Sequence, residues 1–388
     1  MARGSPLYAS LAAVLALAPA CKHFDFPFAA NPPSNLIKTS MPHGAVDVRY
    51  LGSGGFLIKR GQAVLMTAPL FTNPYLPDYF LGKKLRPRRK FVRDFVDSVN
   101  RIADGAAGTE FAAELKAVTL VVSGHAHYDH LLDVPAVVAA EFMNGPTVLT
   151  SLTGKRTLTF YQVPNLIALN EPTDNYVDFT TLSACDSVSE GCSMPGGAKG
   201  KWWPSAGGTQ AGIRVLAVSS DHPPQLGGVL FWPGCHAAPL TREPTSLEDW
   251  RVGEVIAFLI DFLDTSGQVA YRIYYEDAPL PPCRRAPLKA QVEADKHEVD
   301  LALLCTGNYK EVPGTAGTVC DLGAREVILH HWEWFFDETT YGKRHLQGLP
   351  GSLPDEYRIL VAQQLQSLGV DHPDDHIKVL APGVRASY

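Results

Sequence analysis

The chain has 388 residues, of which 46% are hydrophobic and 19% are charged, and its formal net charge at pH 7 is -6. These values are typical of a globular protein with a large core, and they exclude a disordered chain and a protein with many membrane-spanning helices. The negative total also argues against a general nucleic-acid-binding surface, so we expect no nucleic-acid partner.

Residues 1–21 have the pattern of an export signal. A positively charged start precedes an apolar stretch over residues 7–18, which is too short to span a bilayer, and small residues follow it. Cys21 comes next and predicts a bacterial lipoprotein, anchored to a membrane through a lipid on this cysteine. Plain signal-peptidase cleavage, which leaves a periplasmic or secreted protein, is the alternative. Residues 22–45, rich in proline, serine and asparagine, are then expected to form a tether.

The remaining cysteines are even in number, which fits an oxidising compartment and disulfide bonds. Six buried thiols are the alternative, and the spacing does not determine the pairing. These cysteines are Cys185, Cys192, Cys235, Cys283, Cys305 and Cys320.

Folded structure is expected from residue 46 onward. Apolar and alternating runs at 46–50, 56–58 and 63–66 predict a β-meander, broken by glycines. The segment 83–93 then carries seven basic residues in eleven. It is either a patch for phosphate or anionic lipid headgroups or, as we favour, a solvated face before a helix at 91–102.

The most informative stretch follows a predicted strand at 117–122. His125, His127, Asp129 and His130 lie within six residues, too dense a cluster for isolated core or surface histidines. On an extended backbone His125 and His127 point to the same side. Imidazole and carboxylate ligands suit zinc, and less selectively iron or manganese. A helix predicted at 131–143 would begin at this cluster and stabilise Asp129 as a carboxylate.

Further strands and one helix are expected downstream. Residues 171–212 shift to Thr, Ser, Gly and Asp and are interpreted as an insertion. Its adjacent Trp202 and Trp203 indicate an active-site lid, a membrane-facing tip or, more commonly, aromatic packing. The expected strands are 147–150, 165–169, 213–218, 255–262, 269–275, 299–305, 327–329 and 377–380, and the helix runs from Pro354 to about Gly369.

The motif His125-Ala-His127-Tyr-Asp129-His130 resembles the HxHxDH signature of the metallo-β-lactamase superfamily. The resemblance implies one α/β (α+β) domain over residues 46–388, built as a four-layer αββα sandwich with loop insertions. It also implies two divalent metal ions, zinc first and iron or manganese as alternatives.

The same resemblance implies further ligands where later strands end. His222 follows the strand at 213–218, Asp277 follows the strand at 269–275 and would bridge both ions, and His331 is chosen over His330 because Trp332 follows it. One ion would bind His125, His127 and His222. The other would bind Asp129, His130 and His331.

Two residues depart from the family pattern. Thr67 stands where the family commonly has a supporting aspartate, and Glu276 precedes Asp277 where glycine is usual. Glu276 adds a carboxylate that lies either near the metals or turned away from them. Both changes concern groups around the ligands, which tune metal affinity and activity.

The function implied is that of an exported metal-dependent hydrolase that activates water between two ions, with Asp129 as the catalytic residue that orients this water. The run from His127 to Asp133 and the pair His331-Trp332 resemble the branch containing N-acylphosphatidylethanolamine phospholipase D. That branch implies a phosphodiester, in a small molecule or a lipid. Hydrolysis of a lactone, ester or amide is one alternative, and a non-catalytic metal-binding exported protein is another.

The substrate-binding residues stay unknown at this stage. The irregular segment 226–244 comes soon after His222, so Phe231, Trp232 and His236 are weak candidates for substrate contacts.

Overall fold

The computed structural model describes residues 46–75, 85–103, 109–171, 176, 200–204, 211–225, 228–336, 348–349 and 352–388. The predicted export signal, the tether and most of the insertion lie outside these residues, as do Cys21, Cys185 and Cys192. Those predictions are therefore untested by the structure.

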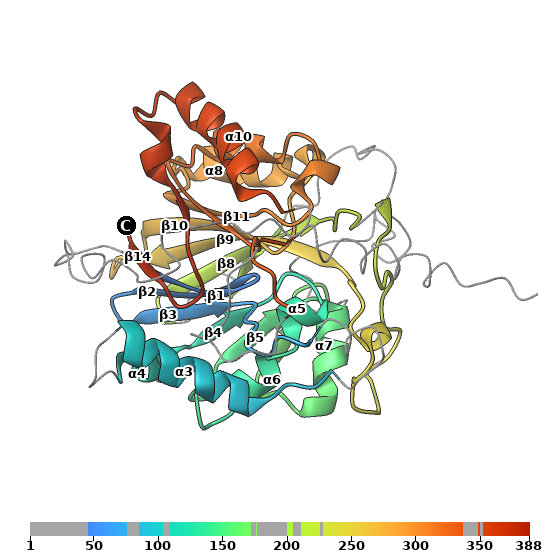
Figure 1. Ribbon diagram of the computed structural model, residues 1–388. Helices are drawn as coiled ribbons and strands as arrows, with labels where there is room; N and C mark the ends of the chain where they lie inside the picture. The colour runs from blue at the N-terminus through green and yellow to red at the C-terminus, as the bar shows by residue number, and fades with distance from the viewer. Residues whose placement is uncertain are drawn as a thin grey trace, which may run out of the picture.

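Two seven-stranded sheets form the centre of the molecule (Figure 1). Each contains three antiparallel and three parallel strand pairs. The first sheet has the order β14 (Arg385–Ser387), β1 (Asp47–Gly52), β2 (Gly55–Arg60), β3 (Ala63–Thr67), β4 (Leu120–Val122), β5 (Thr147–Thr150), β6 (Leu166–Ala168). The second has the order β13 (Ile377–Val379), β12 (Glu326–His330), β11 (Leu301–Cys305), β10 (Val269–Glu276), β9 (Val255–Leu263), β8 (Ile213–Ser220), β7 (Trp202–Trp203).

Helices cover the outer face of each sheet (Figure 1). Those on the side of the first sheet are α3 (Arg89–Ala103), α4 (Glu110–Ala117), α5 (Tyr128–Leu131), α6 (Val134–Val137) and α7 (Leu152–Leu158). Those on the second are α8 (Ala286–Asp295), α9 (Thr318–Leu322) and α10 (Pro354–Ser367). Short 3-10 helices lie at Thr159–Tyr161, Leu247–Asp249, Pro282–Arg284, Tyr309–Glu311, Thr315–Gly317 and Pro373–His376.

Three apolar layers hold these elements together. One lies between the two sheets, where Val48, Phe56 and Ile58 meet Phe258 and Ile273. The other two lie between each sheet and its helices. Alternating strand residues supply opposite faces, so each sheet buries both sides, as sheets covered on both faces do. The expected four-layer αββα sandwich is confirmed.

The helix expected at 131–143 is wrong as a single element. The chain forms α5 and α6 instead, separated near Asp133. Pro135 has no backbone N–H and interrupts helical hydrogen bonding. Asp133 is also engaged elsewhere, because its carboxylate accepts the N–H groups of Phe71 and Thr72 at 2.6 and 2.5 Å.

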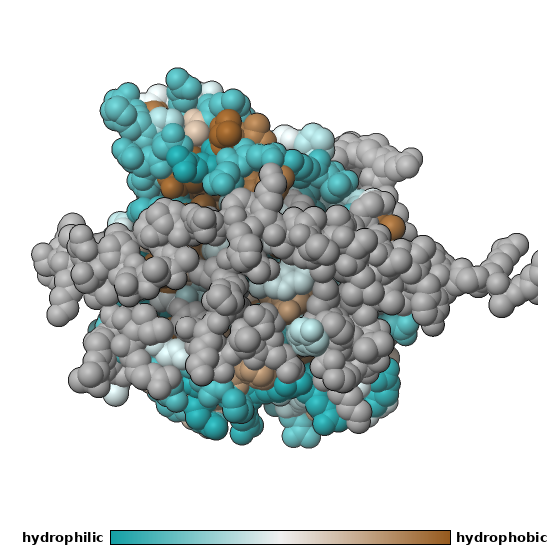
Figure 2. Space-filling view, viewed as in Figure 1, coloured by the Kyte–Doolittle hydropathy of each residue, from teal (hydrophilic) through white to brown (hydrophobic). Residues whose placement is uncertain are grey.

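The basic segment agrees with the solvated-face interpretation where the structure describes it. Arg86 pairs with Glu243, and Lys90 and Arg93 pair with acidic side chains on or near α3. In the view of Figure 2 the outer helical layers are mainly hydrophilic. These charges therefore leave little unpaired positive surface on this part of the chain.

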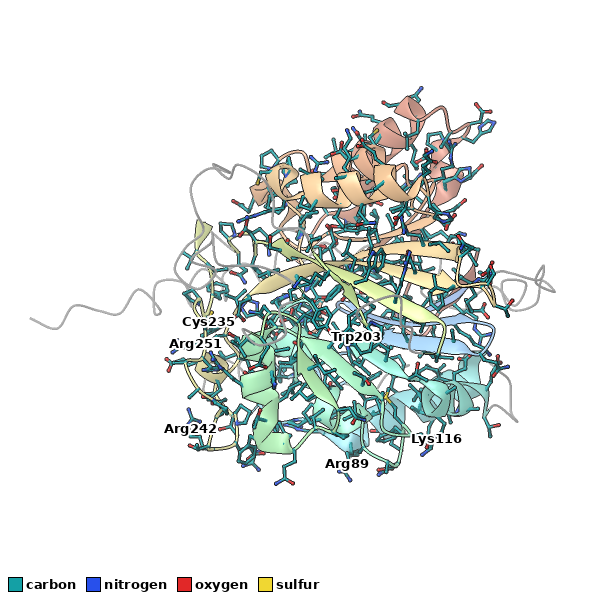
Figure 3. All side chains as sticks on the ribbon, turned by 180° about the vertical axis from the view of Figure 1, so that it is seen from behind. Arg89, Lys116, Trp203, Cys235, Arg242 and Arg251 are labelled. Carbon is teal, nitrogen blue, oxygen red and sulfur yellow. The ribbon has the colours of Figure 1, made fainter. Side chains whose placement is uncertain are left out.

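The tryptophan pair packs against the domain. Trp203, labelled in Figure 3, is 6% exposed, and the guanidinium of Arg214 lies 4.1 Å from the ring centre of Trp202. Among the described cysteines, Cys235 and Cys283 are disulfide-bonded, whereas Cys305 and Cys320 are free thiols. Not all six cysteines are therefore paired. No helix in the described part of the chain combines the length and hydrophobicity needed to cross a membrane.

Candidate metal centre

The site lies at one edge of the sandwich, where strands from both sheets end. His125 follows β4, His222 follows β8, Asp277 follows β10 and His331 follows β12. The two sheets are tied at this edge, because the N–H of Ile256 donates to the carbonyl of Gly124 at 2.8 Å. Residues far apart in sequence are thus carried to one place.

All seven sequence-predicted ligands come together there. They form three groups, and within each group the candidate ligand atoms lie within 4.8 Å of one another. The groups are His125, His127 and His222; Asp129, His130 and His331; and His125, His130 and Asp277. The third group takes one histidine from each of the others, so Asp277 lies between them.

Two imidazoles are oriented by backbone carbonyls. Nε2 of His127 lies 3.1 Å from the carbonyl oxygen of Phe231, and Nδ1 of His222 lies 2.7 Å from that of Pro223. A carbonyl only accepts, so these nitrogens carry the proton. The unprotonated nitrogens are therefore Nδ1 of His127 and Nε2 of His222, which are free to act as ligands.

Other ring nitrogens at the site are buried and unpaired. Within the described part of the chain, both nitrogens of His125 and Nδ1 of His130 and His331 have no hydrogen-bond partner. Buried polar atoms are nearly always paired, because leaving one unpaired costs about 1–3 kcal/mol. Several orphaned imidazole nitrogens around carboxylates fit a metal ion, and the donor set suits zinc, iron or manganese.

The electrostatics favour the protonation states that metal binding requires. Burial lowers the pKa of His127 to about 3 and holds the pKa values of His130 and His222 well below the usual range. Burial alone would raise the pKa of Asp129, but His130 and His331 hold it well below its usual range. The site therefore offers neutral imidazoles and an ionised carboxylate.

His331 differs from the other histidines. Burial lowers its pKa, but the hydrogen bond and charge of Asp129 outweigh burial and raise it. Its Nε2 lies 3.1 Å from Oδ2 of Asp129 and 3.2 Å from Nε2 of His130. At low pH His331 is protonated, so a metal ion bound by these three residues would have to displace that proton.

His330 faces away from the cluster. Its ring packs against Phe56 and Tyr275, with centroids 5.2 and 5.8 Å away, and its Nδ1 lies 3.2 Å from the carbonyl oxygen of Ser53. His331 lies just beyond the end of β12 with a φ of 59°, in the left-handed region. This turn of the backbone directs His331 toward Asp129.

Asp277 is held by three donors. Its Oδ2 accepts the N–H groups of Gly124 at 2.5 Å and His125 at 3.1 Å, and its Oδ1 accepts the hydroxyl of Tyr275. A Cβ on Gly124 would lie 2.9 Å from Oδ2 of Asp277, so only glycine allows this approach. The carboxylate is thereby locked against the His125 loop.

Thr67 and Glu276 have different roles. Thr67 Oγ1 accepts the N–H of Phe56 at 2.8 Å and donates to the carbonyl of Gly54 at 2.6 Å, so it supports the loop between β1 and β2. Glu276 is turned away from the cluster, and its carboxylate accepts the hydroxyl of Tyr274 at 2.7 Å and the N–H of Leu280 at 3.0 Å. Glu276 therefore does not add a ligand.

The segment between β8 and β9 borders the site on one side. Cys235, Arg242 and Arg251, all from this segment, lie on the same side of the molecule in Figure 3. Phe231 reaches the cluster through its carbonyl oxygen. His236 does not join it, because its Nε2 lies 2.8 Å from the carbonyl oxygen of Asp249.

Sequence reasoning missed several supporting residues. Tyr275 donates a hydrogen bond to Asp277. Glu333 accepts hydrogen bonds from the hydroxyl of Tyr50 and from the N–H of Ser53. The only signal for them was position, since Tyr275 precedes Asp277 by two residues and Glu333 follows His331 by two.

No protein-family model matches the chain, and no curated protein matches it. Among solved structures it resembles Igni18, a metallo hydrolase from the archaeon Ignicoccus hospitalis, with 15% identity and a TM-score of 0.44 over 89% of this chain and 98% of that one. It also resembles the metallo-β-lactamase fold protein YhfI from Bacillus subtilis, with 11% identity and a TM-score of 0.39. That match covers 88% of this chain and 98% of YhfI. A third is CmlA, a diiron β-hydroxylase from Streptomyces venezuelae, with 12% identity and a TM-score of 0.45; the match covers 90% of this chain and 54% of CmlA.

Proposed function

We propose that this protein is a dinuclear metal-dependent hydrolase. The observation that supports it is the position of Asp277, which groups with one histidine from each of two three-residue ligand clusters. Two adjacent clusters with a carboxylate between them are suited to two ions held close together. Zinc is the metal we propose, because imidazole and carboxylate donors in a buried site suit it.

His125, His127 and His222 would hold one ion, and Asp129, His130 and His331 the other, with Asp277 between them. Metal ions so bound supply Lewis-acid activation of a substrate oxygen and lower the pKa of water. Asp129 is the catalytic residue in this proposal. Its carboxylate stays ionised, so it can accept a hydrogen bond from the attacking water and orient it. No serine or cysteine nucleophile is needed.

We further propose a phosphodiester as the substrate, in a small molecule or a lipid, and export with a lipid anchor on Cys21. The disulfide-bonded Cys235 and Cys283 support an oxidising compartment. The substrate class rests on the sequence resemblance around Asp133 and Trp332.

Metal analysis and a substrate panel test the proposal. Protein purified without chelator is expected to contain about two transition-metal ions per chain and to hydrolyse bis(p-nitrophenyl) phosphate. Activity should disappear on chelation and return with Zn²⁺. Hydrolysis of a lactone, ester or amide in place of the phosphodiester would reassign the substrate, and absence of bound metal would refute the proposal. Mass spectrometry of the mature N-terminus tests the anchor on Cys21.

A further inference from the structure

Glu333 is a buried carboxylate near the candidate ligand cluster. It is 1% exposed and follows His331 by two residues. Its Oε1 accepts the N–H of Ser53 at 2.5 Å, and its Oε2 accepts the hydroxyl of Tyr50 at 2.5 Å. No lysine, arginine or histidine within the described residues forms an ion pair with it. Burying a carboxylate is unfavourable unless hydrogen bonds or an opposite charge compensate it, so we expect a role for Glu333 in the contacts that it makes.

Oε2 of Glu333 is connected to His331 by two hydrogen bonds, with Tyr50 between them. The N–H of His331 donates to the hydroxyl oxygen of Tyr50 at 3.1 Å, and that hydroxyl donates to Glu333. The carbonyl of Ser53 is a second acceptor near Tyr50, at 3.0 Å, but the carboxylate is nearer and is the stronger acceptor. The hydrogen bond therefore holds the amide of His331, whose φ of 59° a histidine seldom adopts.

Oε1 of Glu333 is connected to His130 through the loop between β1 and β2. Ser53, held by Glu333, also has a left-handed backbone, with a φ of 52°. The next residue, Gly54, lies directly against His130, since a Cβ there would be 2.7 Å from Nδ1 of the ring. The carbonyl of Gly54 is held by Tyr275 at 2.8 Å. Glu333 thus holds in place the Ser53-Gly54 backbone against which the His130 ring packs.

Both connections end in the same ligand group. His130 and His331 belong with Asp129, whereas within the described part of the chain neither hydrogen-bond partner of Glu333, Ser53 or Tyr50, contacts His127 or His222.

We propose that Glu333 is a positioning residue for the Asp129, His130 and His331 group alone. Acting through Tyr50 and Ser53, it fixes the backbone that directs both imidazoles, and its charge offsets that of a cation bound there. The inference rests on the proposed function only in requiring that this group binds a metal ion. Its consequence is that the two ions differ in their dependence on Glu333.

Cobalt titration of the metal-free protein tests this dependence. Co²⁺ bound by nitrogen and oxygen ligands absorbs visible light, so occupancy is followed without any substrate. H222A and H331A identify which spectral class belongs to which group. We expect E333Q to weaken the class lost in H331A by roughly 10- to 100-fold and to leave the class lost in H222A unchanged. Excess Co²⁺ should restore the weakened class.

Two further variants separate positioning from a loss of folding. Y50F removes one hydroxyl and leaves the ring, and it should weaken the same class. E326Q is the matched control, since Glu326 lies at the opposite end of β12 and its Oε1 contacts Nδ1 of His376 at 2.7 Å. It should bind Co²⁺ as the unaltered protein does.

Three outcomes would overturn the inference: unaltered binding in E333Q, equal weakening of both classes in E333Q, or no Co²⁺ binding by the unaltered protein. If Co²⁺ binds as expected but the protein hydrolyses none of the substrate panel, the proposed function fails while the role of Glu333 is still decided by the titration.

Discussion

Nε2 of His127 lies 3.1 Å from the carbonyl oxygen of Phe231, a residue 104 positions later in the chain. This hydrogen bond fixes which nitrogen of His127 is free to bind metal. It also links the segment bordering the site to the ligand cluster, so we expect a change in that segment to alter the position of a candidate ligand.

Gln225 gives a direct way to test this link. Its side-chain Oε1 accepts the N–H of Phe231 at 2.7 Å and so holds the peptide next to the critical carbonyl. Gln225→Ala should lower Zn²⁺ affinity by roughly tenfold, measured by competition with a chromophoric chelator. Gln225→Glu keeps an acceptor and serves as the control. Equal affinity in all three proteins would contradict the link.

The adjacent histidines after β12 should respond differently to alanine substitution. His331→Ala removes a ligand, so we expect about one metal ion fewer per chain and severe loss of hydrolysis. His330→Ala removes a ring that packs on Phe56 and Tyr275, so it should keep both ions and lose about 2 kcal/mol of stability. Metal analysis and urea unfolding measure the two effects. Loss of metal in His330→Ala with normal metal in His331→Ala would reverse the assignment.

Gly54 should tolerate no side chain. In Gly54→Ala the new Cβ would lie 2.7 Å from His130 Nδ1 and 2.8 Å from the Tyr275 hydroxyl, so the imidazole must move. We expect loss of metal from the group of Asp129, His130 and His331, detected by metal analysis. Gly61→Asn is the matched control, because nothing lies within 4 Å of a Cβ at Gly61 and asparagine tolerates its φ of 59°. Normal metal content in Gly54→Ala would show that the loop can give way.

Glu276 should make stability fall as pH rises. Burial raises its pKa to about 7 in the folded protein, from an ordinary value of 4.5. Between these two values the folded state keeps a proton that the unfolded state has lost, so rising pH favours unfolding. Over this window the carboxyl should remove about 3 kcal/mol of stability.

Glu276→Gln cannot ionise and isolates this effect. Its free energy of unfolding in urea should fall less than that of the unaltered protein between pH 4.5 and 8. Chelator in both samples removes the pH dependence that metal binding would add. The same pH dependence in both proteins would show that Glu276 titrates normally.

Much of the fold follows from local patterns. The runs at 213–218 and 269–275 predicted β8 and β10, and Pro354 marked the start of α10, because alternation and start signals are set by neighbours in the chain. The strand β14 was not predicted, since its three residues show no apolar alternation. They form a strand only because the end of the chain comes back to pair with β1. The break between α5 and α6 differs from the single predicted helix, because apolar spacing continues across 131–143 while Pro135 lacks the N–H that a continuous helix needs.

The sequence by itself determined the ligand types and the presence of a cluster of potential metal ligands in the motif from His125 to His130, because these donors stand within six residues. It also indicated His222, Asp277 and His331, but only through resemblance. The tertiary structure alone decided how the donors are aimed. The carbonyl of Phe231 and the carboxylate of Glu333 act across 104 and 283 positions of sequence, respectively, on His127 and Tyr50. Contacts between such distant residues exist only once both sheets have packed, so no local pattern encodes them.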